Sequence, residues 1–505
     1  MTIEEYLSTI FTFFQHPFKN DDNVDLLHIP SIPVSSDYIE SVPGLSRWCL
    51  CHEERFLCFL LHLNNRHNRV FYVTSMPVSQ TVIDYYLSLL TQVSPDDARK
   101  RLTMVSCYDT SLTPLCKKLM NRPRLMRRLK DSINPKQTYL STYVHTELEQ
   151  KVALKLGISA ALTPVRSHWG TKLGSRQLFQ WCEIPHCLGT YNLLESTEDV
   201  VEGVIALKTE RPKIKTIIIK LNEGVDGLGN AIWRLPESMD PVVLTKSLIC
   251  NDLWPFNGET PREFLCNLTK GGAIMEEFIE EHGDIKCPSV EGYVDVSGNV
   301  CVVSTHEHIC VDELYQACFF PANADYRLKL QETCTIIGNF LKDRGVRNER
   351  YGVDFLAWQR HDKTWDLRAL EVNLRYPKTT HSMMTLQLVT FDGHMNQNGM
   401  FLLPNGEPRC YFALDSFHNE LLKKLTPDDL LDMIKLYPTW LKFDKTTMKG
   451  TIFYMVDALA AYGSVGIMCI HETPEQASRH FHEVKFILLK EAGYGHIDKT
   501  LMSTR

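Results

Sequence analysis

Apolar runs alternate with helical patterns through residues 1–165. The runs at 69–75, 101–109 and 138–144 predict buried strands, and the patterns at 78–90 and 146–158 predict helices. Regular alternation of strand and helix is typical of an open parallel sheet with helices on its faces. The first third of the chain is therefore predicted to be a Rossmann-like α/β domain.

The pattern changes after residue 165. Gly-rich turns now separate short β-branched segments, and strands follow strands, which favours an antiparallel or mixed α+β region. The extended segments are 214–234, 272–280, 290–305 and 351–374. From about residue 391 the pattern is mixed again, with helices predicted at 452–463 and 474–493. We expect three regions: 1–165, 166–390 and a C-terminal α/β segment 391–505 packed on the middle one.

Composition excludes several classes of protein. With 505 residues, 44% of them hydrophobic, the chain can build more than one core. A formal net charge of -7 argues against a general nucleic-acid or membrane-surface binder. The N-terminus lacks the basic residues of a signal peptide, and no apolar run approaches the ~20 residues that span a bilayer. A cytoplasmic protein with no membrane or nucleic-acid partner is predicted.

Two compositional features leave alternatives open. The sixteen cysteines form no CxxC pair, which favours buried thiols over a disulfide framework or a zinc site. The basic cluster 117–130 is interrupted by Pro123, which favours a solvated helix surface over a partner-binding segment.

The most informative loop lies in residues 216–235. A β-branched run ends at Lys220 and leads into a loop with Gly224, Gly227 and Gly229, followed by Asn230 and a second apolar run. Glycines let successive backbone N–H groups approach phosphate oxygens. The GxxxxGK[ST] string of a P-loop is absent, and this loop joins two strands rather than a strand and a helix. The pattern predicts a phosphate-covering flap, or alternatively a Gly-rich hairpin without a ligand.

A second pattern places carboxylates on a predicted hairpin in residues 350–382. Asp354 on one strand and Glu371 on the next should face the same site, with Asn373 and Arg375 following on the face of Glu371. Two carboxylates and an amide oxygen are suitable ligands for Mg²⁺. A salt-bridge network between Glu371 and Arg375 is the alternative.

Two further segments are weak by themselves. Glu276 and Glu277 lie in an apolar strand that continues to Ile279, which suits either an adenine- and ribose-binding strand or a solvated edge strand. Lys172 precedes a helical stretch that ends near Pro185. Alone, Lys172 is an ordinary exposed lysine.

Taken in order, these four segments resemble the ATP-grasp superfamily. The chain is most similar in type to the pheganomycin-type peptide ligases, with the strings YVTSMPVSQTVIDYYL (72–87), TKLGSR (171–176), STHEHI (304–309) and NLRYPKTTHS (373–382). The similarity runs over nearly the whole chain. It implies a pre-ATP-grasp domain, a two-lobed ATP-grasp fold and a family-specific C-terminal segment.

The resemblance also implies roles for the residues. Lys172 and Lys220 would contact the ATP phosphates, beneath the flap with Gly224, Gly227, Gly229 and Asn230. Glu276, Glu277 and Ile279 would hold adenine and ribose, and Asp354, Glu371 and Asn373 would bind Mg²⁺. Arg375 would steady the transferring phosphoryl group, because a planar guanidinium suits spread negative charge.

The implied activity is an ATP- and Mg²⁺-dependent carboxylate-amine ligase that acts through an acyl-phosphate on small-molecule or peptide substrates. His306, His308 and His381 are candidates to orient the carboxylate or accept a proton, and His381 is preferred because it follows the metal-binding strand. Each is alternatively a structural histidine. Whether the chain forms a homo-oligomer stays open.

Two departures from the family pattern bear on function. Asp226 lies in the flap, and Tyr376-Pro377-Lys378 stands where the resemblance predicts Gly-rich sequence. They leave a non-catalytic ATP-grasp homologue, acting as a nucleotide-binding interaction module, as the alternative function. A kinase-like phosphotransferase with the same fold is a third alternative, which differs only in the group that accepts the phosphoryl group.

Overall fold

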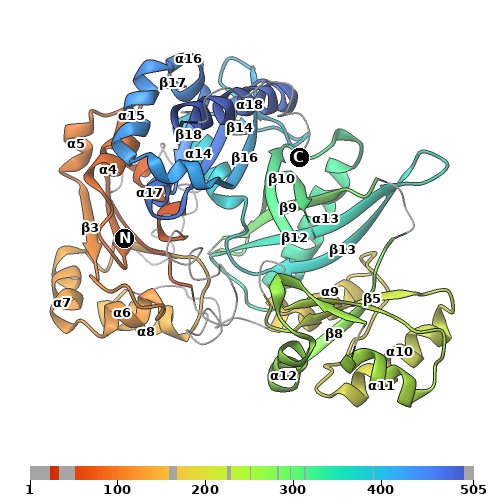
Figure 1. Ribbon diagram of the computed structural model, residues 1–505. Helices are drawn as coiled ribbons and strands as arrows, with labels where there is room; N and C mark the ends of the chain where they lie inside the picture. Colours follow the sequence, from red (N-terminus) through yellow and green to blue (C-terminus); the bar gives the residue numbers. More distant parts are fainter. Residues whose placement is uncertain are drawn as a thin grey trace.

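The computed structural model contains three β-sheets surrounded by helices (Figure 1). It describes residues 23–32, 52–158, 168–224, 229–250, 252–280, 284–295, 297–311, 314–390 and 392–493. The sheets are one of four parallel strands, one of four antiparallel strands and one of eleven strands. Gly227 and Asp226 of the predicted flap lie outside the described residues.

The first sheet has the strand order β3-β2-β1-β4, and all its neighbours are parallel. Its elements are β1 (Val24–Ile29), β2 (Asn68–Thr74), α4 (Gln80–Ser88), α5 (Pro95–Arg99), β3 (Leu102–Ser106), α6 (Leu115–Met120), α7 (Pro123–Ser132), β4 (Thr138–Thr142) and α8 (Glu147–Leu156). Helices connect the strands, so β1 and β2 are buried along almost their whole length. The predicted parallel α/β region is confirmed.

The second sheet has the order β7-β6-β5-β8 and is antiparallel throughout. Its elements are α9 (Lys172–Trp181), α10 (Thr197–Glu210), β5 (Thr216–Leu221), β6 (Asn230–Arg234), α11 (Pro241–Cys250), β7 (Leu253–Pro255), α12 (Pro261–Gly271) and β8 (Ala273–Glu277). Trp233 of β6 is fully buried against α10, α11 and α12. The Gly-rich loop joins β5 to β6, which confirms the predicted strand–loop–strand arrangement.

The third sheet follows the path β13-β12-β9-β10-β11-β16-β19-β18-β17. Its elements are β9 (Cys287–Val294), β10 (Val300–Val311), β11 (Leu314–Phe320), α13 (Ala324–Asp343), β12 (Glu349–Gln359), β13 (Trp365–Asn373), α14 (Thr380–Val389), β14 (His394–Met395), β15 (Phe401–Leu402), β16 (Pro408–His418), α15 (Pro427–Leu436), α16 (Pro438–Leu441), β17 (Phe443–Asp444), β18 (Lys449–Tyr454), α17 (Ala458–Tyr462), β19 (Ser464–His471) and α18 (Pro474–Glu491). Because β16 pairs with β11, the segments before and after residue 390 share one sheet.

One predicted helix is wrong. The segment 452–463 was expected to be helical throughout, but it begins in strand β18 and turns into the short helix α17 only at Ala458. Ile452 and Phe453 lie in register with β19 in the sheet interior. A β-branched and aromatic run packs well on a pleated surface, and here that packing outweighs the helical pattern of the alanines that follow. The predicted helix 474–493 is confirmed as α18.

The two ends of the described chain share one hydrophobic core. Helix α4 packs beside β18, where the Tyr85 hydroxyl lies 2.8 Å from the backbone N–H of Phe453 and accepts its hydrogen bond. The amide of Asn64 donates to the carbonyl of Leu388 in α14 at 3.1 Å. Figure 1 shows the orange helices of the first domain beside the blue C-terminal elements. These contacts fix the first domain to the far end of the large sheet.

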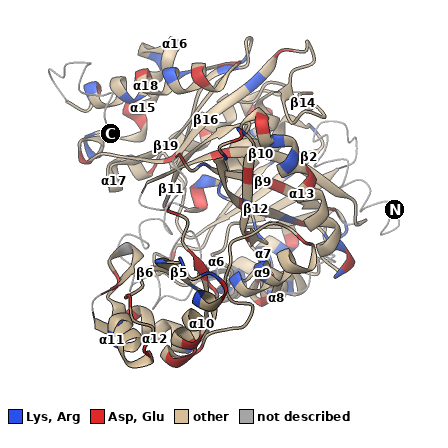
Figure 2. Cartoon of the chain, turned by 90° about the vertical axis from the view of Figure 1, so that its right-hand side faces the viewer, with Lys and Arg blue, Asp and Glu red and all other residues tan. Residues whose placement is uncertain are grey.

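Charges of both signs occur on the outer helices (Figure 2). In the basic cluster, Arg124, Arg127 and Arg128 of α7 are exposed, whereas Lys118 is buried and donates to the Ser75 hydroxyl at 2.7 Å. Pro123 begins α7, which separates the cluster into two helices as predicted. Among the described residues, no helix combines the length and apolarity that crossing a membrane requires.

A buried ion-pair network connects α9 to the second sheet. Arg176 of α9 is fully buried and pairs with Glu276 of β8, which also pairs with Lys220 of β5 at 2.5 Å. The Arg176 guanidinium also donates to the carbonyls of Thr190 at 2.7 Å and Cys187 at 3.1 Å. One guanidinium therefore connects α9 to β8 and to the segment that holds Cys187 and Thr190.

Replacing Arg176 by leucine should destabilise the protein strongly. It leaves the Glu276 carboxylate buried with one partner fewer and two carbonyls without a donor, a loss of ~3–5 kcal/mol in unfolding free energy. Urea unfolding followed by tryptophan fluorescence measures this loss. The matched variant Arg360→Leu removes an exposed arginine that pairs with Asp366, and its effect should stay below ~1 kcal/mol. Equal effects of the two substitutions would contradict the role of Arg176.

Candidate active site

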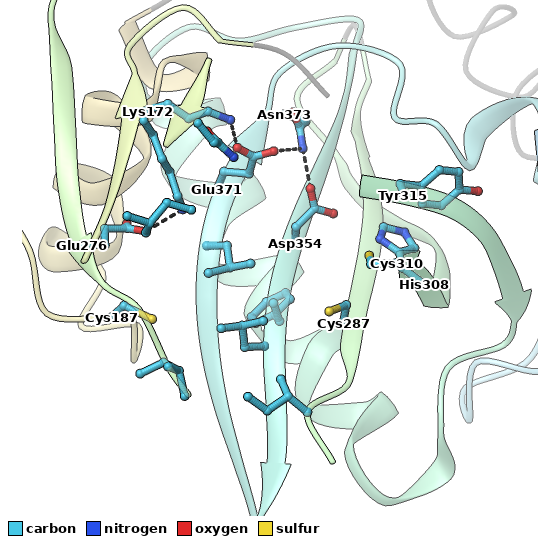
Figure 3. Close-up of a pocket in the computed structure, with 18 of the residues that line it drawn as sticks. Lys172, Cys187, Glu276, Cys287, His308, Cys310, Tyr315, Asp354, Glu371 and Asn373 are labelled. Atoms are coloured by element: carbon cyan, nitrogen blue, oxygen red, sulfur yellow. Dashed lines mark hydrogen bonds and ion pairs between the residues drawn. The ribbon is translucent and has the colours of Figure 1, made fainter. Parts of the chain in front are cut away.

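A cavity of about 380 Å³ lies between the second sheet and the β12–β13 hairpin (Figure 3). Of the residues predicted from the sequence, its walls contain Lys172, Lys220, Asn230, Glu276, Glu277, Ile279, Asp354, Glu371, Asn373 and Arg375. The structure thus brings together candidates that are spread over more than 200 residues of sequence. Gly224, Gly229 and His381 are not among the lining residues that the structure describes.

The sequence positions Lys172 at the first turn of α9. The Thr171 hydroxyl caps this helix by accepting from the backbone N–H of Gly174 at 3.0 Å. A Cβ on Gly174 would lie 1.8 Å from the carbonyl oxygen of His168, so only glycine fits there. The backbone N–H of Lys172 donates to the carbonyl of Asn222, just after β5, at 3.1 Å. The start of the helix is therefore fixed beside the Gly-rich loop.

Lys172 is paired and buried. Its ammonium forms an ion pair with Glu371 of β13, across from the second sheet. Burial, together with the neighbouring charges of Lys220 and Arg375, lowers the pKa of Lys172 to about 7. A polyanion that replaced Glu371 as the partner of Lys172 would favour the protonated form of this lysine.

The carboxylate of Glu276 positions the Lys220 ammonium and is not itself left open to a ligand in the cavity. Burial alone would raise the pKa of this carboxyl, but Lys220 and Arg176 lower the pKa to about 2, so it stays ionised. It orients the Lys220 ammonium toward the cavity. The sequence did not single out Arg176 as a site residue, although it lies in the TKLGSR string. Glu277 pairs with Arg211 and accepts from the backbone N–H of Leu188 at 3.0 Å.

The predicted metal ligands converge. Asp354 and Glu371 are register partners on β12 and β13, as predicted. The Asn373 amide lies between them and donates to Asp354 Oδ2 at 2.8 Å and to Glu371 Oε1 at 3.2 Å (Figure 3). Among the described residues, no group of three or more His, Cys, Asp and Glu side chains forms a metal site.

This donor set fits Mg²⁺. Two carboxylates and one amide oxygen are hard ligands, and Mg²⁺ commonly takes only a few protein oxygens beside phosphates and water. Turning the Asn373 amide would point its oxygen at the space between Asp354 and Glu371. The two nearby carboxylates repel each other unless a cation compensates. In this structure the Lys172 ammonium supplies that charge, and the neutral Asn373 amide donates a hydrogen bond to each carboxylate.

Arg375 contacts the first domain. Its Nε donates to the hydroxyl of Tyr143, which follows strand β4, at 3.1 Å. The sequence did not identify Tyr143, because it lies 232 residues away in another predicted domain. The first domain therefore takes part in positioning a residue of the site.

The flap residue Asn230 faces the cavity with an unused acceptor. Its amide oxygen is buried and has no hydrogen-bond partner among the described residues. Gly229 has a φ of +79°, which favours glycine, and its carbonyl accepts from the backbone N–H of Leu221 at 2.7 Å. The base of the hairpin is therefore ordered where it meets the cavity.

The three candidate histidines lie in different places. His308 lines the cavity next to Asp354 and hydrogen-bonds the Ser289 hydroxyl at 2.7 Å (Figure 3). His306 is buried and bonds the hydroxyl of Tyr411 at 2.6 Å. His381 is buried behind the cavity, where its Nδ1 accepts from Arg55 at 3.3 Å. Burial lowers the pKa of all three, so each is neutral at pH 7.

Comparison with known proteins shows what the whole chain is similar to. No protein-family model matches the sequence. The chain is 25% identical over 450 residues to an L-propargylglycine--L-glutamate ligase from Streptantibioticus cattleyicolor, covering 86% of this chain and 89% of the relative. That relative is a ligase of two amino acids, which agrees with the predicted resemblance to peptide ligases.

Solved structures show the same overall fold. A biotin carboxylase from Campylobacter jejuni in complex with β-γ-ATP matches with a TM-score of 0.53 and 12% identity, covering 93% of this chain and 95% of that one. The biotin carboxylase domain of the Hydrogenobacter thermophilus 2-oxoglutarate carboxylase, solved with MgADP, ADP and bicarbonate, matches with a TM-score of 0.52 and 12% identity over 91% and 88%. These matches confirm the predicted ATP-grasp fold.

Nucleotide binding should depend on pH through Lys172. Because its pKa is about 7, the ammonium is largely lost above that pH. A phosphate bound to Lys172, as the family resemblance implies, would restore it. Mg·ADP binding should therefore take up protons and weaken as pH rises from 7 to 9. Calorimetry in buffers of different ionisation enthalpy measures the uptake. Lys172→Arg keeps its charge at every pH, so it should bind without this uptake; identical uptake in both proteins would contradict the assignment.

Proposed function

We propose that this protein is an ATP-dependent ligase that joins a carboxylate to an amine through an acyl-phosphate. The observation that carries the proposal is that one cavity contains three cationic side chains, Lys172, Lys220 and Arg375, together with the Asp354–Glu371 carboxylate pair. A cavity with these cations but without the carboxylate pair could bind any anion. Carboxylates that suit Mg²⁺, beside cations that suit phosphates, are the combination that ATP requires.

The cavity supplies a place for each part of ATP. Ile218, Ile279 and Leu356 form apolar walls on which an adenine ring can pack. The backbone after β8 runs along the same end of the cavity as these apolar walls. The Glu277 carboxylate also lines the cavity and could accept a hydrogen bond from a ribose hydroxyl. Lys172 and Lys220 would then face the phosphates, at the end of the cavity that leads to the carboxylate pair.

Asp354, Glu371 and Asn373 would hold the magnesium ions. Bound there, Mg²⁺ would neutralise charge on the phosphate oxygens and hold them in position. The pairing of Lys172 with Glu371 and of Asn373 with both carboxylates would be exchanged for ligand contacts. These residues are therefore preorganised by one another before the nucleotide arrives.

The chemistry has two steps. An oxygen of the substrate carboxylate attacks the γ-phosphorus, the bond to the bridging oxygen of ADP breaks, and an acyl-phosphate forms. Arg375 would stabilise the negative charge on the transferred group with its planar guanidinium, held in place by Tyr143. The amine then attacks the acyl carbon, and inorganic phosphate leaves as the new amide forms.

His308 is the histidine best placed to accept the proton of the attacking amine. It lines the cavity, whereas His381 and His306 do not. Burial lowers its pKa, so it is neutral and can accept a proton at physiological pH. The Ser289 hydroxyl would fix the orientation of its ring.

A non-catalytic nucleotide-binding module is a poorer account of this site. Binding ATP alone does not need Arg375 and a neutral histidine beside the metal ligands. We further propose that the enzyme works in the cytoplasm, where ATP is available and where thiols stay reduced; Cys58, Cys107 and Cys116 are buried thiols that form no disulfide.

ADP release should require both a carboxylate and an amine. L-glutamate and L-propargylglycine, the amino acids in the name of the relative, begin a panel of L-amino acids in a coupled ADP assay. Arg375→Met should lower kcat by ~10²–10³-fold with little change in the KM for ATP, because its charge acts on the transferred phosphoryl group. Arg368→Met, on strand β13 that leads to Arg375, is the matched control. ADP release that is independent of any acid or amine, or an unaffected Arg375→Met enzyme, would contradict the proposal.

A further inference from the structure

The strand that carries Glu371 and Asn373 lies at the edge of the large sheet. Of the strands that the structure describes, β12 is the one that pairs with β13 along its length. On the outer side of β13, the described residues form an isolated bridge between His186 and Ala369. An edge strand presents backbone N–H and C=O groups that have no partner in the sheet. The outer side of β13 therefore needs other partners to hold Glu371 and Asn373 in place.

Helix α9 supplies such a partner at Val372, the residue between Glu371 and Asn373. The backbone N–H of Val372 donates to the hydroxyl oxygen of Ser175 at 2.9 Å. Both residues are buried, and Ser175 is fully so. A buried backbone N–H without an acceptor is strongly unfavourable. Because this N–H belongs to the peptide unit that joins Glu371 to Val372, Ser175 fixes the backbone directly beside a candidate metal ligand.

The Ser175 hydroxyl is itself held in one orientation. It donates its proton to the carbonyl of Thr171, one helical turn earlier, at 2.8 Å. A hydroxyl has one proton and two acceptor positions. Donation to Thr171 therefore turns the oxygen into an acceptor for Val372, and one hydroxyl connects the first turn of α9 to the edge strand.

Close packing on both sides of Ser175 keeps the helix against β13. Before the helix, a Cβ on Gly170 would lie 2.9 Å from the Cβ of Leu374, so the chain approaches the end of β13 more closely than most residues allow. Further along the helix, Leu178 packs in the same hydrophobic core as Val372 and Leu374. The hydrogen bond from Val372 to Ser175 is therefore made between two elements that are already fixed relative to each other.

The contact of Ser175 differs in kind from that of Lys172 on the same helical turn. Lys172 pairs with the carboxylate of Glu371 (Figure 3), and this pair has to be exchanged when a cation takes the carboxylate. The bond between Ser175 and Val372 involves neither a ligand atom nor a charge. It can therefore persist when the metal binds, and it holds the ligand strand in both states.

We propose that Ser175 is a positioning residue for the magnesium site. Its hydroxyl fixes the peptide unit between Glu371 and Val372, so that the Glu371 carboxylate and the Asn373 amide keep their places beside Asp354. The inference rests on the proposed function, because that proposal makes these residues metal ligands. Groups that orient metal ligands without touching the metal commonly change metal affinity by ~10–100-fold when they are removed.

Calorimetric titration of ADP with and without Mg²⁺ tests the role of Ser175 without turnover. Mg²⁺ should tighten ADP binding to the native protein by more than ~10-fold, because the metal joins the carboxylates to the phosphates. Ser175→Ala should reduce this gain by ~10-fold and change the affinity for metal-free ADP by less than ~2-fold. Ser175→Thr keeps the hydroxyl and should retain the gain. Thr333→Val is the matched control, because it removes a buried hydroxyl that donates within its own helix to Lys329 at 2.9 Å.

The outcomes separate the role of Ser175 from the ligase activity. An unchanged gain from Mg²⁺ in Ser175→Ala, or an equal loss of ADP affinity with and without the metal, would overturn the inference. Ser175→Cys, whose sulfur is a weaker acceptor, takes the place of Ser175→Ala if urea unfolding shows that the alanine variant is not folded. If the gain from Mg²⁺ alone is lost but no acid with any amine yields ADP, the positioning role stands and the ligase proposal fails. If the native protein shows no effect of Mg²⁺ on ADP binding, the inference is wrong together with the metal site on which it rests.

Discussion

The structure depends on keeping several buried charges of both signs paired in and beside one cavity. Helix α9 contributes Lys172 to Glu371 of the large sheet and Arg176 to Glu276 of the small sheet. An unpaired buried charge is strongly unfavourable, so these contacts hold the helix and both sheets in one arrangement. The same pairs leave Lys172 and Lys220 facing the cavity with their charges positioned for an anionic ligand.

The first and last parts of the chain support that arrangement from outside. The first domain supplies Tyr143 and Ser141, which position Arg375 and the loop after it. The C-terminal strands continue the large sheet and share a hydrophobic core with α4. The segments that look like separate domains in the sequence are therefore parts of one scaffold around the site.

Local patterns sufficed to predict some features and failed for others. The pairing of Asp354 with Glu371 followed from strand alternation across a hairpin, and the Lys220 loop followed from its glycines. The helix predicted for 452–463 was wrong, because the start of this segment pairs with β19, a strand that the local pattern does not reveal. Arg176 and Tyr143 could not be identified as site residues, since their importance comes from contacts that the chain fold creates. The position of His381 behind the cavity depends likewise on Arg55, 326 residues away.

The central claim is that a substrate carboxylate takes the γ-phosphoryl group of ATP. The most direct measurement follows ¹⁸O from a labelled substrate carboxylate into the inorganic phosphate released during turnover, by mass spectrometry. The account predicts that each phosphate gains one ¹⁸O atom and that ADP is the nucleotide product. Release of AMP and pyrophosphate, or phosphate whose extra oxygen comes from water, would contradict it.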